Sequence, residues 1–327
     1  MEKPITIYDN PYDVSKKEKY TFRFHPNRVC VPVGMACNVQ CKYCMRNNGK
    51  TREIKELSDM FKEFLKQLDP AKTEAIVMNG GEPLLYIDRI KEIFSLVPKS
   101  IHKCVMTNGT LLTQDFVDYL NSVGGELHFS HEGIAAEYLK GRDILKEPKM
   151  VDLLNQVKRM RVYTLICSYN PDVMENFNYI YSRLDKVEKL YYTVFPMFCY
   201  PGSEDLIKDF DFDTFTRSFA ELKIKYPHLT NTSPFHAKYK RNNGLVVLPD
   251  GSVGCLSSMK RYGTVENSVE ELRQRIKEAG DMDYCLSQDC YIRDECSMSY
   301  QFANPFTCKA QARMVEVLSY LRDQNAY

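Results

Sequence analysis

Hydrophobic positions along the first two thirds of the chain switch repeatedly between helical and strand spacing. Residues 54–68 carry apolar side chains every three or four positions and stop at an Asp-Pro pair, which predicts an amphipathic helix. The apolar run at 75–78 ends in an Asn-Gly-Gly turn and predicts a buried strand. The alternation continues with expected helices near 86–96, 113–122, 148–160 and 173–184, and expected strands at 103–107, 126–130, 162–168 and 188–195.

An opening strand at 30–34 completes about six β/α units. Alternating units of this kind favour a parallel sheet curled into a barrel, so the expected fold class is α/β with a partial (β/α)6 TIM-like barrel.

The alternation ends near residue 196. Beyond it we expect a helix at 211–225, a hairpin at Asp250-Gly251, a helix at 268–279, a cysteine-rich loop at 284–308 and a terminal amphipathic helix. The expected organisation has three parts, which are an N-terminal extension at 1–29, the barrel at 30–230 and a small cysteine-rich domain at 231–327.

Composition narrows the class of protein. The 327 residues include 44 Lys plus Arg and 43 Asp plus Glu, so the net charge of +1 gives no reason to expect nucleic acid as a partner. No apolar run approaches the ~20 residues that span a bilayer, and the N-terminus does not resemble a signal peptide. We therefore expect a cytoplasmic protein with no membrane partner.

The twelve cysteines are many for such a protein. Reduced thiols in a cytoplasmic chain indicate metal sites or catalysis more often than disulfides. Cys199 could face a substrate cavity and exchange a hydrogen atom, although packing is the simpler interpretation. Four scattered cysteines are expected to be small buried side chains, namely Cys30, Cys104, Cys167 and Cys199.

Three cysteines follow the first predicted strand in the pattern CxxxCxxC, at Cys37, Cys41 and Cys44. Thiolates this close in sequence can converge on one metal centre and leave one coordination position open. A zinc site completed by His25 or His102 is the alternative.

This motif, with the aromatic Tyr43 before its last cysteine, resembles the signature of the radical S-adenosylmethionine (SAM) superfamily. The resemblance implies that the three cysteines hold a 4Fe–4S cluster whose fourth iron binds SAM. It also implies reductive cleavage of SAM to a 5′-deoxyadenosyl radical, which abstracts hydrogen from a substrate.

Further matches occur where later strands end. Gly80-Gly81-Glu82 resembles the GGEP motif of the family, in which glycines permit close backbone approach and the carboxylate accepts from the SAM ammonium. Thr107-Asn108 begins a segment that is similar to the family's TNG. Each is an ordinary turn when taken alone, but sites on barrels are built at these strand ends.

The resemblance implies further SAM contacts after the fourth and fifth strands. Ser130 would contact the SAM carboxylate, and Arg142 stands nearest to the expected family arginine. Glu132 replaces the usual aspartate, which leaves its role open. Asn170 would contact the SAM ribose.

The C-terminal cysteines resemble those of SPASM and Twitch extensions, which bind auxiliary iron–sulfur clusters. The spacing departs from the SPASM pattern, because Tyr300 stands where its last cysteine would be. One auxiliary 4Fe–4S cluster is therefore expected, with structural zinc as the alternative. Its candidate ligands are Cys255, Cys285, Cys290, Cys296 and Cys308.

Together these features imply a radical SAM oxidoreductase or maturase that modifies a peptide or protein side chain by crosslinking, epimerisation or oxidation. The alternative is a dehydrogenase or rearrangement enzyme acting on a small molecule, and a more remote one is a non-catalytic metal-binding protein. An electron donor such as flavodoxin or ferredoxin would be the partner.

Overall fold

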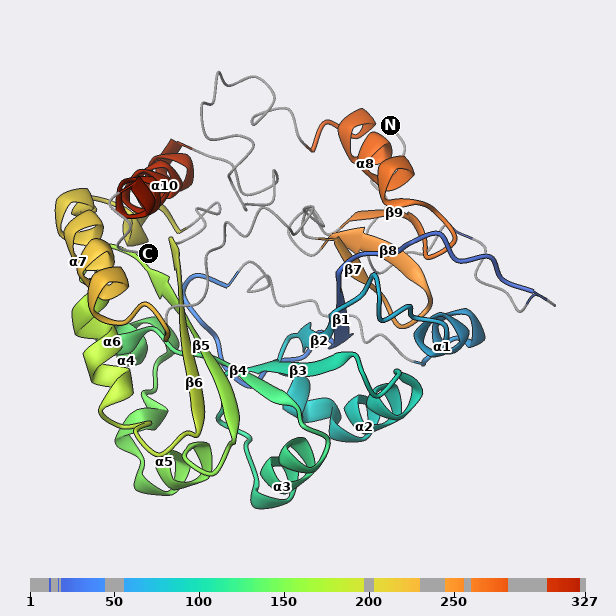
Figure 1. Cartoon of the computed structure of the whole chain (residues 1–327), viewed down its shortest axis with the longest axis horizontal. Helices are drawn as coiled ribbons and strands as arrows, with labels where there is room; N and C mark the ends of the chain where they lie inside the picture. Colours follow the sequence, from blue (N-terminus) through green and yellow to red (C-terminus); the bar gives the residue numbers. More distant parts are fainter. Residues whose placement is uncertain are drawn as a thin grey trace.

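A curved, six-stranded parallel sheet forms the centre of the protein (Figure 1). The structure is a computed structural model. It describes residues 12, 17, 19–44, 56–196, 203–229, 245–255, 260–281 and 305–323.

The strands follow one another in chain order across the sheet, from β1 at one edge to β6 at the other, and each pairs in parallel with the next. This arrangement confirms the predicted α/β class with a partial barrel. The strands are β1 (Arg28–Gly34), β2 (Ala75–Gly80), β3 (His102–Thr107), β4 (Glu126–Ser130), β5 (Arg159–Ile166) and β6 (Lys189–Pro196).

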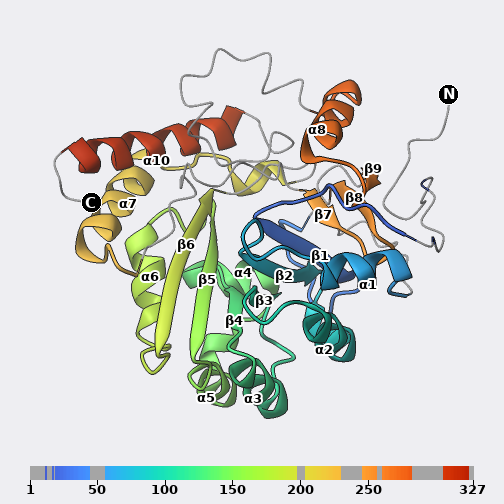
Figure 2. The same ribbon diagram turned by 45° about the vertical axis from the view of Figure 1, so that its right-hand side comes forward.

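Helices cover the outer face of the sheet, as Figures 1 and 2 show together. They are α1 (Asp59–Lys66), α2 (Ile87–Leu96), α3 (Gln114–Ser122), α5 (Pro148–Leu154), α6 (Val173–Tyr181) and α7 (Phe212–Lys225). The short helix α4 (Ala136–Lys140) lies instead at the carboxyl end of the sheet, where the Leu139 carbonyl accepts from the Lys42 N–H. The apolar stripe of α1 is buried as its spacing predicts, and the hydroxyl of Ser58 caps its first turn by accepting from the Phe61 N–H.

Side chains alternate between two environments along each strand. Met160 and Val162 of β5 are fully buried in the core beneath the helices, whereas Arg161 and Tyr163 point to the concave side and remain partly exposed. The concave side also carries Glu126 and His128 of β4. Strands β4 and β5 therefore turn apolar side chains to the core beneath the helices and polar side chains to the interior.

The start of β5 differs from the predicted boundary. A helix was expected to reach residue 160, but α5 ends at Leu154 and β5 begins at Arg159. The basic residues Arg159 and Arg161 alternate with Met160 and Val162 at the start of the strand. The predicted strand followed the continuous apolar run and therefore left out these charged positions, which face the interior.

The described C-terminal segments pack against the barrel. They comprise a three-stranded antiparallel sheet of β7 (Leu245–Val247), β8 (Ser252–Cys255) and β9 (Lys260–Thr264), followed by α8 (Val269–Glu278) and α10 (Pro305–Asp323). The hairpin at Asp250-Gly251 is as predicted, and β9 adds a strand. Helix α10 lies beside α7 in both views, and the rings of Phe210 and Phe306 meet at 5.0 Å (Figures 1 and 2).

Two sequence expectations concern this region. Cys308 was placed in a cysteine-rich loop, but it lies in the first turn of α10, which begins at Pro305. The second expectation is a domain boundary near residue 230. One continuous hydrophobic cluster contains residues from both sides of this position, Val31 of the barrel together with Val247 and Met314. The boundary near residue 230 stays a prediction.

No helix among the described residues combines the length and the apolar character that crossing a membrane requires. The expected cytoplasmic location stays a prediction.

Gly80, at the end of β2, offers a test of how closely the first two strands approach. Its φ is +130°, and a Cβ there would lie 2.1 Å from the Gly34 carbonyl oxygen. We expect Gly80→Ala to lower the unfolding free energy by clearly more than the ~1–2 kcal/mol of a left-handed backbone penalty. Gly124→Ala is the matched control, since its φ of +64° has open space around it. Equal losses in denaturant unfolding of the two variants would contradict the close approach.

Candidate functional site

The three motif cysteines lie on the loop that leaves β1 at the carboxyl end of the sheet. Cys37 is exposed, whereas Cys41 and Cys44 are half-buried. The loop is held by backbone hydrogen bonds, from the Cys44 N–H to the Cys41 carbonyl at 3.0 Å and from the Lys42 N–H to the Leu139 carbonyl of α4 at 2.9 Å. Burial raises the pKa of the Cys41 thiol to about 11.

The spacing of these thiols bears on which metal centre they suit. Sulfurs around a single tetrahedral zinc lie about 3.8 Å apart, whereas each cysteine of a 4Fe–4S cluster binds a different iron. Among the described residues, the sulfur atoms of these three cysteines do not all lie within 4.8 Å of one another. The three sulfurs are therefore not placed as close together as the ligands of one zinc would be.

The zinc alternative also needed a histidine. His102 begins β3 and His25 precedes β1, so both lie toward the amino end of the sheet while the cysteines lie at its carboxyl end. The structure therefore does not bring either histidine to the cysteine loop.

The glycine turn after β2 is packed directly on the cysteine loop. The Gly81 N–H donates to the Gly34 carbonyl at 2.9 Å, and the Glu82 N–H donates to the Ala36 carbonyl at 2.8 Å. A Cβ on Gly81 would lie 1.9 Å from the Ala36 oxygen. These glycines therefore permit close approach to the backbone of the cysteine loop. The sequence pattern instead predicts close approach to a ligand.

Glu82 is buried and joins the ends of β2 and β3. Its Oε1 accepts from the Thr107 hydroxyl at 2.7 Å and from the Leu84 N–H at 2.9 Å, and its Oε2 accepts from the Asn108 N–H at 2.9 Å. Burial raises the pKa of this carboxyl, although the three hydrogen bonds oppose the shift. A carboxylate has about four acceptor positions, so Oε2 retains one for a further donor.

Asn108 links the same strand end to the cysteine loop. Its Nδ2 donates to Asn38 Oδ1 at 3.1 Å and lies 3.9 Å from the Cys37 sulfur, while its Oδ1 accepts from the Thr110 hydroxyl at 2.6 Å. The predicted site residues Cys37, Glu82, Thr107 and Asn108 therefore form one connected group.

A buried ion pair organises the end of β4. The Glu132 side chain is fully buried, and its Oε2 lies 2.8 Å from Nζ of Lys140. Lys140 also donates to the carbonyl and the hydroxyl of Ser130, at 2.6 and 3.1 Å. The Tyr43 hydroxyl donates to Glu132 Oε1, so the cysteine loop is bound to the same carboxylate. Burial, followed by the neighbouring Glu132 charge, raises the pKa of Tyr43 well above its usual value.

Two predicted SAM contacts have other partners in the structure. Arg142 is half-exposed and pairs with Glu147, with 2.6 Å between Nη2 and Oε2. Asn170 is fully buried, and its amide group binds the backbone at Glu132, Leu165 and Cys167. The structure thus gives Asn170 a role in holding the loops, and the ribose contact stays a prediction.

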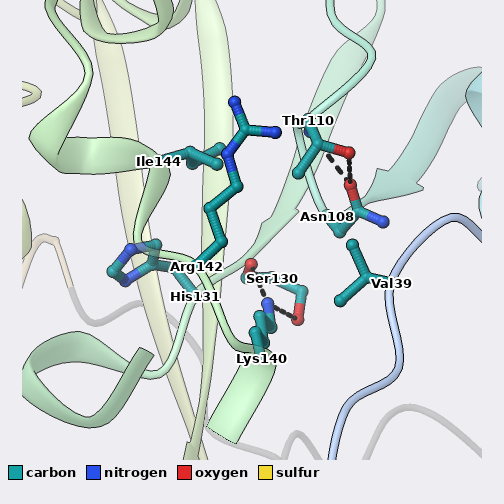
Figure 3. Close-up of a pocket in the computed structure, with 8 residues that line it drawn as sticks. All are labelled: Val39, Asn108, Thr110, Ser130, His131, Lys140, Arg142 and Ile144. Carbon is teal, nitrogen blue, oxygen red and sulfur yellow. Dashed lines mark hydrogen bonds between the residues drawn. The ribbon is translucent and has the colours of Figure 1, made fainter. Parts of the chain in front are cut away.

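The cation at Ser130 is Lys140, which the sequence reasoning missed. Both Lys140 and Arg142 border a small pocket between the cysteine loop and the ends of β3 and β4 (Figure 3). Lys140 projects from the last turn of α4, a short helix that was not predicted. The pocket is lined by Val39, Asn108, Thr110, Ser130, His131, Lys140, Arg142 and Ile144.

A second missed group supports the β4 loop from behind. His131 is buried, its Nδ1 accepts from the Gly133 N–H at 3.1 Å, and its Nε2 lies 2.9 Å from Asp143 Oδ1. Nε2 therefore carries the hydrogen. Burial opposes ionisation of Asp143, but hydrogen bonds from His131 and Tyr179 lower its pKa to about 2. A histidine directly after the predicted Ser130 was the available signal.

The C-terminal candidates are only partly within the described structure. Cys255 ends β8 and is buried in the main hydrophobic cluster, and Cys308 is half-buried on α10. Cys285, Cys290 and Cys296 lie outside the described residues. The auxiliary site stays a prediction.

Comparison with known proteins agrees with this geometry. Residues 31–183 match the sequence model of the radical SAM superfamily. That segment begins within β1, runs past β5, and contains the predicted residues at the carboxyl ends of these strands. Residues 31–183 therefore resemble the radical SAM domain, and this match covers just under half of the chain.

Among curated relatives, the GTP 3′,8-cyclase of Clostridium botulinum is 28% identical over 163 residues, which are 46% of this chain and 51% of the relative. The AdoMet-dependent heme synthase of Methanosarcina barkeri is 27% identical over 114 residues, or 34% of this chain and 33% of the relative. The chain thus spans about half the length of the cyclase, and less of the synthase.

Likeness to solved structures covers more of the chain. The enzyme anSMEcpe with bound AdoMet and the Kp18Cys peptide has a TM-score of 0.62 at 17% identity, covering 92% of this chain and 99% of that one. Streptococcus suis SuiB bound to S-adenosylmethionine has a TM-score of 0.61 at 15% identity, covering 88% and 78%. At these identities the likeness is one of fold.

The buried ion pair can be tested by a double-mutant cycle. Lys140→Met leaves the Glu132 charge buried without its cation, so we expect a loss of about 3–5 kcal/mol in unfolding free energy. Adding Glu132→Gln should restore most of that loss, because no buried charge remains. Denaturant unfolding of both single variants and the double variant measures the coupling. Arg142→Met, which removes an exposed pair, is the control; additive effects of the Lys140 and Glu132 changes would refute the pairing.

Proposed function

We propose that this protein is a radical SAM enzyme that abstracts hydrogen from a side chain of a peptide or protein substrate, leading to crosslinking, epimerisation or oxidation. The observation that carries the substrate class is the extent of the fold likeness. It reaches 92% of this chain in a comparison with a peptide-bound enzyme, well beyond the radical SAM domain.

The residues at the carboxyl end of the sheet fit the two cofactors. Cys37, Cys41 and Cys44 would hold three irons of the cluster, since they share one loop and one of them is exposed. When bound, the cluster supplies the electron that cleaves SAM and generates the hydrogen-abstracting radical. The loop itself is fixed by the Tyr43 to Glu132 hydrogen bond and by the backbone bonds from Gly81 and Glu82.

The polar groups around the pocket divide the recognition of SAM. Glu82 Oε2 has an acceptor position for the ammonium group. At the pocket, Ser130 and Lys140 would present a hydroxyl and a cation to the carboxylate. Lys140 joins Arg142 in this proposal, because both border the pocket, Lys140 paired with Glu132 and Arg142 with Glu147.

An auxiliary 4Fe–4S cluster would serve as the acceptor for the electron that oxidation of the substrate releases. Its proposed ligands come from Cys255, Cys285, Cys290, Cys296 and Cys308. Structural zinc at the same cysteines remains the competing proposal.

A small-molecule substrate is the second candidate. The observation that favours it is the sequence similarity between this chain and the C. botulinum GTP 3′,8-cyclase. The similarity covers only about half of that relative, so it bears on the shared domain and less on the part that would select a substrate.

Iron content and SAM cleavage test the cofactor assignment. After anaerobic reconstitution, the Cys37→Ala, Cys41→Ala, Cys44→Ala triple variant should hold about four fewer irons per chain than the parent. It should also form no 5′-deoxyadenosine from SAM with dithionite, which replaces the expected flavodoxin or ferredoxin donor. Cys30→Ala, which changes a cysteine within β1 that has no proposed ligand role, is the matched control. Undiminished SAM cleavage by the triple variant would overturn the assignment.

The substrate class can be decided with deuterated probes. Short peptides encoded beside this gene, made with deuterated side chains, should raise the yield of 5′-deoxyadenosine and transfer deuterium into it. Deuterated GTP is the small-molecule probe in the same assay. Transfer from GTP and none from any peptide would replace the first proposal by the second.

A further inference from the structure

A second group of metal-binding side chains lies at the opposite end of the barrel from the cysteine loop. His102 and Cys104 are two residues apart on β3, so they share the interior face of that strand. Glu126 begins β4 directly opposite Cys104 in the pairing register. All three therefore meet at the amino end of the sheet, away from the proposed radical site.

The ligand atoms of these three residues lie within 4.8 Å of one another. Nε2 of His102 and Oε2 of Glu126 are 3.4 Å apart, which is long for a hydrogen bond. Two ligands about 2.0 Å from one tetrahedral ion are about 3.3 Å apart, so the observed separation matches an edge of such a site.

The surroundings leave one oxygen of Glu126 directed at this group. Oε1 is occupied, because it lies 2.9 Å from His128 Nε2 and 3.0 Å from Arg161 Nε. These contacts orient the carboxylate in the way that outer partners orient metal ligands. Arg161 also lies over the Tyr191 ring at 4.9 Å, so its charge has a second partner. Oε2 has the 3.4 Å contact to His102.

Burial and access also suit an ion. Cys104 is 1% exposed and Glu126 4% exposed, so an ion there would be shielded from bulk water. The His102 side chain is 29% exposed and gives a route from solvent. A solvent molecule reaching the same point would supply the fourth ligand.

We propose that His102, Cys104 and Glu126 bind a borderline divalent ion, Zn²⁺ in the first instance. One thiolate and one carboxylate would bring two negative charges to the ion, although the guanidinium groups of Arg28 and Arg161 also act on this carboxylate. The thiol proton leaves to solvent as the metal–sulfur bond forms. The nitrogen, sulfur and oxygen donors match the ligands that zinc accepts. The ion ties β3 to β4 where the barrel is furthest from its reactive end, which indicates a structural role.

The test uses the full chain with its iron already reconstituted, equilibrated with buffered Zn²⁺. Zinc and iron are counted together, and X-ray absorption at the zinc edge reports the ligands. We expect a zinc with one sulfur at about 2.3 Å and nitrogen or oxygen neighbours at about 2.0 Å. A zinc bound only by sulfur would place it at the C-terminal cysteines and overturn the proposal, as would the absence of bound zinc.

Matched variants assign the ligands. His102→Ala and Cys104→Ser should each lose about one zinc per chain while retaining the parent iron content. His228→Ala and Cys167→Ser, which remove a histidine and a buried cysteine elsewhere, should retain both metals. Retention of zinc by the first pair would refute the site. Circular dichroism checks that each variant folds. If a variant does not fold, the zinc-edge X-ray absorption spectrum of the parent protein still tests the ligand set. Iron content and 5′-deoxyadenosine formation are separate readouts, so this proposal can fail while the proposed function stands.

Discussion

The buried carboxylate of Glu132 is the interaction on which the proposed reactive end of the barrel depends. It is fully buried, paired with Lys140 and bonded to Tyr43, so it joins α4, the end of β4 and the cysteine loop. Its backbone carbonyl accepts from Asn170 after β5, which extends the connection to a further strand. A charge buried in this way needs each of these partners, and the loops are therefore held in one arrangement.

The two ends of the barrel interior show how one scaffold separates tasks. At the carboxyl end, Glu82 and Asn108 place hydrogen-bonding groups around a loop of cysteines. At the amino end, Glu126 gathers two histidines and Arg161 around a single cysteine. The apolar residues beneath the helices supply the common core, since the same strands present their other face there.

The sequence predicted the order of elements and the strand ends well. The boundaries of β4 match the prediction, β3 begins one residue earlier than predicted, and β6 is shifted by one residue at both ends. The errors have physical causes. Strand β5 begins with Arg159 and Arg161, whose charged side chains face the barrel interior. These charges interrupt the apolar run, so the pattern predicted that the preceding helix continues to residue 160. The prediction groups Cys308 with the preceding Cys285, Cys290 and Cys296 in one loop, although α10 already begins at Pro305.

The site residues likewise divide into those that local motifs predict and those that only the tertiary structure identifies. Local motifs are sufficient to find Cys37, Gly80, Gly81 and Glu82, because short loops after parallel strands must meet at one edge of the sheet. Motifs do not determine which cation reaches Ser130. Lys140 and Arg142 are two positions apart, and only the direction of α4 and the partner Glu147 decide between them.

By itself the sequence determined the class of fold, the cysteine loop and the strand ends, because each depends on spacing within a short stretch of chain. The tertiary structure alone decided that Lys140 neutralises Glu132, that Asn170 holds backbone, and that His102, Cys104 and Glu126 meet. Those contacts join side chains from different strands and helices, and their geometry is set by the packing of the whole barrel.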